Sequence, residues 1–218
     1  MCKVTAFLDD DNFILTSNRD IPEDREHSLP PNEFLYRNKR IVYPEDPQGG
    51  GSWIGASTQY IASLLNNKGI KGINKMSRGI LIKEVLSNNF FISDLESKSN
   101  SFNPYVLILF NIVDRVLFKY TWDGSNFYSE QINKHDLWMS NTIYSEEEIT
   151  DTYRCFREEL NISSNEEEIL KFHLDPKNIL VDQMKTTSVT QIKYGLKNEV
   201  KYFDLINSKD YSYKLSLY

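Results

Sequence analysis

The sequence opens with Met1-Cys2, which puts a thiol directly after the initiator methionine. Removal of Met1 is efficient before a small residue, and it leaves Cys2 with a thiol and a free α-amine on one residue. An α-amine has a reference pKa of about 7.7–8.0, so it is partly neutral at neutral pH and can accept the proton of its own thiol. Cys2 is therefore a candidate nucleophile that needs no catalytic histidine. On position alone, the simpler interpretation is a small residue that begins a buried strand.

The charged segment Asn18-Arg19-Asp20 is the next candidate. An arginine near a thiolate lowers the pKa of the thiol, and an aspartate can hold an α-ammonium group or receive its proton. If residues 2–8 pair antiparallel with residues 13–19, the hairpin returns this segment to the start of the chain. The simpler alternative is a solvated salt bridge at a strand end, which contributes little to stability.

Two asparagines, Asn66 and Asn141, end predicted strands, where a side-chain amide can donate to a developing oxyanion. Either one alone is more simply a turn residue. Gly49–Gly51 gives backbone freedom that would let N–H groups approach a ligand, although no phosphate-loop lysine follows. Cys155 lies in a predicted helix and is expected to be unreactive. No Cys, His or carboxylate cluster has metal-ligand spacing, so we expect no metal and no cofactor.

The composition excludes several classes of partner. The 218-residue chain has a net charge of −6, so it should repel nucleic acid outside short basic stretches such as Lys39-Arg40 and the segment from Lys68 to Lys75. No apolar run reaches the roughly 18 residues of a membrane span, and no secretory signal is visible. The two cysteines are therefore expected to be free thiols in a reducing cytoplasm.

The predicted elements occur in blocks, which favours an α+β fold over alternating βαβ units. A 13% aromatic content also favours sheet. The segment from Asp20 to Asn38 is predicted to be a long loop. Two strand-rich blocks are each followed by helices, and a last hairpin closes the chain; the predicted helices begin at Ser77, near Phe91, at Ser145 and at Asn165, and the last hairpin covers residues 188–206.

Several short motifs are spread over nearly the whole chain: Met1-Cys2, Asn18-Arg19-Asp20, Gly50-Gly51-Ser52-Trp53-Ile54-Gly55, Ala62-Ser63-Leu64-Leu65-Asn66, Ser77-Arg78-Gly79, Trp138-Met139-Ser140-Asn141 and Thr187-Ser188-Val189. In their order and approximate spacing they resemble the motifs of the NRDE family, also called the transport and Golgi organisation protein 2 family. The family is similar to the N-terminal-nucleophile hydrolases, close in layout to bile-salt hydrolases and penicillin V acylases.

That resemblance implies a single domain over residues 1–218, folded as a four-layer αββα sandwich with two antiparallel sheets between helices. By the same likeness, Cys2 is the nucleophile and Asp20 orients its α-amine. Arg19 supplies positive charge near the thiol, and Asn66 and Asn141 take the positions of oxyanion-binding and amine-binding asparagines. Asn18 and Trp53 are the implied substrate-binding residues.

The sequence also departs from the family pattern. Ile21 stands where the family has Glu, Ser52 and Leu65 each replace Thr, and Lys185 or Thr186 stands where an Arg is expected before the last hairpin. Arg19 and Asp20 are adjacent, and neighbouring strand residues point to opposite faces.

Two functions remain open at this stage. The first is a hydrolase that cleaves an amide or related acyl bond of a small molecule by thiolate attack. The second is a non-catalytic protein that carries or handles haem or a lipid metabolite, because a fold does not fix an activity.

Overall fold

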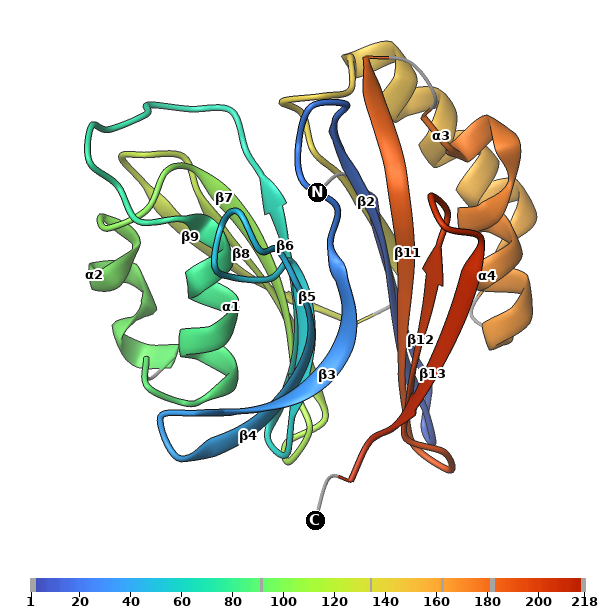
Figure 1. Cartoon of the computed structure of the whole chain (residues 1–218), viewed down its shortest axis with the longest axis horizontal. Coiled ribbons are helices and arrows are strands. Elements are labelled where there is room, and N and C mark those ends of the chain that lie inside the picture. The colour runs from blue at the N-terminus through green and yellow to red at the C-terminus, as the bar shows by residue number, and fades with distance from the viewer. Residues whose placement is uncertain (1–2, 91, 134, 162, 181–182, 217–218) are drawn as a thin grey trace. The chain divides into compact units, whose positions relative to one another are not determined.

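The computed structural model describes residues 3–90, 92–133, 135–161, 163–180 and 183–216. The chain divides into two compact units: the first combines residues up to 25 with 133–215, and the second contains residues 26–132. Figure 1 shows that each unit carries a sheet with helices against it. Among the residues described, no helix is both long enough and apolar enough to cross a membrane.

The sheet of the first unit is antiparallel and has six strands in the described part of the chain. In spatial order they are β10 (Asp136–Met139), β1 (Lys3–Leu8), β2 (Phe13–Pro22), β11 (Met184–Tyr194), β12 (Glu199–Asp204) and β13 (Lys209–Lys214). The N-terminal hairpin, meaning β1 and β2, therefore has a neighbouring strand on each side. The predicted last hairpin is confirmed as β11 and β12, and the edge strand β13 is an element that the sequence prediction missed.

Two helices cover one face of this sheet: α3 (Glu146–Glu159) and α4 (Glu166–Leu174), with the 3-10 turn η2 (Pro176–Asn178) after them. Both helices begin with a capping box, at Ser145 and Asn165, where the cap side chain accepts a backbone N–H and a glutamate reaches back. These two predicted helix starts are confirmed. The helices and the hairpin share one apolar cluster: Phe7, Ile14, Leu137, Phe156, Leu160, Ile169 and Phe172.

The sheet of the second unit is antiparallel and has seven described strands. In spatial order they are β3 (Leu29–Tyr36), β4 (Lys39–Glu45), β5 (Ile54–Ser57), β6 (Tyr60–Asn66), β7 (Tyr105–Asn111), β8 (Val116–Trp122) and β9 (Phe127–Ile132). The prediction of one long loop from Asp20 to Asn38 is wrong, because β3 lies within it. The strand is at the sheet edge, and its pairing with β4 is irregular between Leu29 and Asn32, where two prolines are tolerated.

Helices also line the second sheet. Helix α1 (Arg78–Leu86) contacts β5 and β6, and η1 (Ile92–Asp94) leads into the short α2 (Leu95–Ser99). Ser77 precedes α1 as predicted, but its side chain makes no capping hydrogen bond. The described chain is thus an α+β protein with two antiparallel sheets and helices against each, which confirms the predicted fold class. A single domain over 1–218 stays a prediction.

Candidate functional site

The candidate site begins at the carboxyl end of β2. Lys3, the first described residue, pairs with Asn18, and the predicted antiparallel pairing of the hairpin is confirmed from Lys3 onwards. Arg19 and Asp20 therefore lie just beyond the described end of β1. Cys2 lies outside the described residues.

Asn141 lies at the same end of this sheet. On the other side of β1, Lys3 pairs with Met139, the last residue of β10, and Asn141 follows two residues later. Ser140, between them, is fully buried and its hydroxyl contacts that of Thr142 at 2.9 Å. Two of the sequence motifs, Asn18-Arg19-Asp20 and Trp138-Met139-Ser140-Asn141, therefore meet at one end of the sheet of the first unit.

Asp20 is not a solvated strand-end charge, because only 1% of its surface is exposed. The Tyr144 hydroxyl donates to Oδ2 at 2.8 Å, and the Thr186 hydroxyl donates to Oδ1 at 2.5 Å. The backbone N–H of Leu180 donates to Thr186 Oγ1 at 2.9 Å, which leaves the hydroxyl hydrogen for the carboxylate. The carboxylate is thus held in place by two hydroxyl groups that are far away in sequence.

A β-bulge in β11 brings Thr186 to Asp20. The two strands pair as Thr186 with Asp20 and Ser188 with Arg19, so Thr187 is an extra residue. A bulge changes which face the preceding residue points to, and here it turns the Thr186 side chain to the Asp20 face. Lys185 pairs with the next residue of β2, Ile21, and its ammonium contacts the exposed Glu23 at 2.5 Å.

Arg19 lies on the opposite face of β2 from Asp20. The side chains of Asn18 and Asp20 both bond to groups on the helix-covered face, and strand alternation sends Arg19 the other way. Its exposed fraction is 1%, so the guanidinium is a buried charge and not a surface ion pair. Arg19 and Asp20 therefore lie at the same strand end, but their side chains point to opposite faces of the sheet, as the alternation of strand residues predicts.

His173 of α4 clamps the helix to the hairpin. Asn18 Nδ2 donates to the backbone oxygen of His173 at 3.2 Å, so Asn18 Oδ1 is the acceptor that faces His173 Nδ1. Nδ1 therefore carries the proton, and Nε2 accepts from the Thr5 hydroxyl at 2.8 Å. Complete burial, with a smaller contribution from the Lys3 charge, lowers the pKa of His173 well below its usual 6.5. The ring is neutral and serves as a structural link.

Lys3 adds a cation to these buried polar contacts between the hairpin and α4, and only 2% of its surface is exposed. Its Nζ donates to Asn178 Oδ1 at 2.7 Å, and Asn178 Nδ2 in turn donates to the Phe172 carbonyl at 2.8 Å. The ammonium also lies 5.9 Å from the ring centroid of Tyr144 and 5.8 Å from that of Phe172, within cation–π range. Tyr144 thus contacts both the Lys3 ammonium and the Asp20 carboxylate.

The remaining candidates belong to the second unit. Asn66 ends β6, is half-buried and pairs with Tyr105 of β7. Trp53 is fully buried, and its backbone oxygen accepts from the N–H of Leu64 at 2.8 Å. The role of Asn66 as an oxyanion-binding or amine-binding residue, and substrate binding by Trp53, stay predictions.

The glycine run has a structural use in this unit. A Cβ atom on Gly51 would lie 2.3 Å from the carbonyl carbon of Gly79, and the Ser52 N–H donates to the Gly79 oxygen at 3.1 Å. The Gly-Gly-Ser-Trp and Ser-Arg-Gly motifs therefore meet where the chain entering β5 crosses the first turn of α1. Because Gly51 has no side chain, these two backbone segments can lie in contact.

Sequence reasoning missed the groups that hold the candidate carboxylate. Tyr144 and Thr186 carry no motif of their own, and the sequence marks Thr186 only as a possible replacement for an expected arginine. His173 and Asn178 also gave no signal, because their partners lie about 155 to 175 residues away. Cys155 is half-buried on α3 against the apolar cluster, as a helix-face residue should be.

The fold and the site together define an α+β protein of two sheet-and-helix units with a buried charged site at the end of its N-terminal hairpin. The family model described as Transport and Golgi organisation 2 matches residues 1–208, and the chain belongs to that family. The comparison with curated proteins gave no match.

Proposed function

We propose that this protein is a cysteine N-terminal-nucleophile hydrolase, which cleaves an amide or related acyl bond of a small molecule after removal of Met1. Cys2 is the proposed nucleophile, and its α-amine is the base. The reaction needs a reduced thiol, which fits a cytoplasmic protein without a bound cofactor.

The Asp20 carboxylate is the observation that carries this proposal. It is buried, and two hydroxyl groups hold it at the end of the strand that pairs with β1. Cys2 precedes Lys3 in the chain, and Lys3 pairs with Asn18, two residues from Asp20. A fixed, buried carboxylate at this end of the hairpin suits an α-ammonium group, which it would hold by charge-assisted hydrogen bonds.

The charges around the hairpin end also support a reactive thiol. In the described part of the hairpin end, Lys3 and Arg19 are two buried cations, and Asp20 is one buried carboxylate. An excess of positive charge favours the thiolate over the thiol and lowers the pKa of a cysteine. Cys155 is half-buried on a helix face, and its cationic neighbour Lys177 is paired with the carboxylate of Glu159.

The proposed reaction follows from these groups. The thiol proton moves to the α-amine, and the sulfur bonds to the substrate carbonyl carbon. Amide groups of Asn66 and Asn141 are the proposed donors to the oxyanion. The C–N bond then breaks, and the leaving amine takes the proton from the α-ammonium. Water attacks the thioester, the C–S bond breaks, and the carboxylic acid leaves with the thiol restored.

The test combines intact mass with alkylation. We expect the mass to lack Met1 and brief iodoacetamide treatment to label Cys2 and not Cys155, as peptide mapping will report. In a Cys155→Ser background, Asp20→Asn should slow alkylation several-fold at neutral pH and change its pH–rate profile. Asp24→Asn, an exposed charge four residues away, is the matched control and should leave the profile unchanged.

Melting temperatures of both variants separate loss of the site from loss of the fold. Retained Met1, preferential labelling of Cys155, or identical profiles for Asp20→Asn and the unmodified chain would each remove the hydrolase proposal. The carrier of haem or a lipid metabolite would then be the better interpretation.

A further inference from the structure

The loop between β6 and α1, residues 67–77, is the strongest unexplained surface of the second unit. It contains Lys68, Lys71 and Lys75 and no acidic residue, in a chain whose net charge is −6. It also contains Ile70, Ile73 and Met76, so cations and apolar side chains alternate along it. We call residues 68–76 the basic-apolar loop. Nothing in the proposed hydrolase chemistry uses it.

The basic-apolar loop is anchored to its own unit by backbone contacts. The N–H of Ile70 donates to the Asp123 oxygen at 2.9 Å, and that of Met76 donates to the Ser101 oxygen at 3.0 Å. Gly69 lies so close to the β8–β9 turn that a Cβ there would be 2.0 Å from the Asp123 oxygen. The loop therefore has a fixed attachment at both ends.

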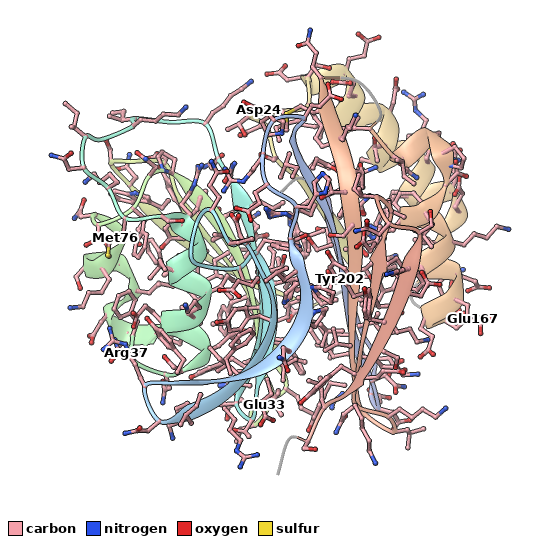
Figure 2. All side chains as sticks on the ribbon, viewed as in Figure 1. Asp24, Glu33, Arg37, Met76, Glu167 and Tyr202 are labelled. Atoms are coloured by element: carbon pink, nitrogen blue, oxygen red, sulfur yellow. The ribbon has the colours of Figure 1, made fainter. Side chains whose placement is uncertain are left out.

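Its apolar side chains nevertheless point away from the core. Ile70 is 67% exposed, Ile73 is 90% exposed and Met76 is 44% exposed. Figure 2 shows the labelled Met76 on the outside of the ribbon of the second unit. A single exposed apolar residue is ordinary, but three between three lysines on an anchored loop are a contiguous surface of mixed character.

We propose that the basic-apolar loop binds the surface of an anionic lipid bilayer. Lysines attract anionic headgroups while neighbouring aliphatic side chains enter the interface, which is how peripheral proteins combine charge with apolar burial. The acidic neighbour Asp123 carries one negative charge against the three lysines, and the N–H groups of Ser125 and Asn126 hold its carboxylate within its own turn.

The apolar residues favour lipid over nucleic acid as the partner. A single strand of nucleic acid is held by bases that stack on aromatic rings, and the basic-apolar loop has none. The side chains of Ile70 and Ile73 cannot form hydrogen bonds to phosphate or bases, whereas they can be buried in the hydrocarbon of a lipid interface.

Vesicle sedimentation of the full-length chain tests the proposal. Vesicles of phosphatidylcholine with about one-third phosphatidylserine should bind the chain, and those of pure phosphatidylcholine should bind it far less. Replacing all three lysines of the loop by Gln should lower the partition coefficient by about 100-fold, since each charge near such a surface is worth about 1 kcal/mol, or fivefold. Ile73→Ser should lower it about tenfold.

Matched control variants remove side chains of the same kinds at exposed positions outside the basic-apolar loop. Val113→Ser takes away another exposed aliphatic side chain, and the triple change Lys39→Gln, Arg40→Gln and Lys209→Gln takes away three exposed cations. Both should bind nearly as well as the unmodified chain, and melting temperatures verify that all variants fold. Absence of binding to anionic vesicles overturns the proposal, as do equal losses in loop and control variants. So does loop-dependent binding of a single-stranded oligonucleotide without binding to vesicles.

Discussion

Acidification is expected to weaken the first unit through His173. In the folded chain this ring is neutral, because its complete burial and, to a smaller extent, the charge of Lys3 hold its pKa well below 6.5. In the unfolded chain the same ring titrates near 6.5. Below that pH the unfolded state binds a proton that the folded state does not, so the free energy of unfolding falls as the pH falls.

The size of the effect follows from the same linkage. Each pH unit below 6.5 costs about 1.4 kcal/mol, so the contribution of His173 falls by about 2 kcal/mol between neutral pH and about pH 5. The assay is urea unfolding at several pH values, followed by a probe of the first unit, for the unmodified chain and His173→Gln. The variant should be less stable at pH 7 by about 1–3 kcal/mol, since Gln cannot serve both Thr5 and Asn18.

The pH slope distinguishes titration from mere loss of packing. His173→Gln should lose less stability than the unmodified chain between neutral pH and about pH 5, by the amount that one proton contributes. His27→Gln, at an exposed position, is the control and should keep the full slope. A slope that is the same for the unmodified chain and His173→Gln would refute the assignment of a buried neutral ring.

Two other substitutions test the site and the scaffold. Tyr144→Phe removes one hydroxyl donor from the buried Asp20 carboxylate and should lower the free energy of unfolding by about 1.5–3 kcal/mol in urea titration; a change below about 0.5 kcal/mol would mean that this contact is not made. Gly51→Ala forces a methyl group against the Gly79 backbone and should destabilise the chain by about 1–3 kcal/mol or more, whereas an unchanged melting temperature would contradict the close approach of these two backbones.

The N-terminal hairpin and the capped helices could be predicted because their signals are local. Alternating residues around an acidic turn define β1 and β2, and a cap followed by three glutamates defines the start of α3 and of α4. The edge strand β3 was missed because its proline pair reads as loop, and only its pairing with β4 makes it a strand.

The environment of the candidate carboxylate could not be predicted in the same way. Motif order drew attention to Asp20, but Tyr144 lies 124 residues from it and Thr186 lies 166 residues away. Whether Thr186 or Thr187 lies opposite Asp20 depends on a single bulge, and no local pattern specifies it. The burial of Arg19 is equally a property of the assembled sheet, since a charged residue at a strand end is usually exposed.

The bulge at Thr187 has a consequence for how this strand can vary in length. Deleting a residue from a regular strand turns every side chain beyond the deletion to the opposite face. Thr187 is already outside the ladder, so a chain that lacked it would still pair Ser188 with Arg19 and Thr186 with Asp20. This is therefore the one point in β11 where related chains can differ in length by a residue while every other side chain of the strand keeps its face. A sequence alignment that forbids a gap there will match the wrong residue to Thr186, which contacts the Asp20 carboxylate.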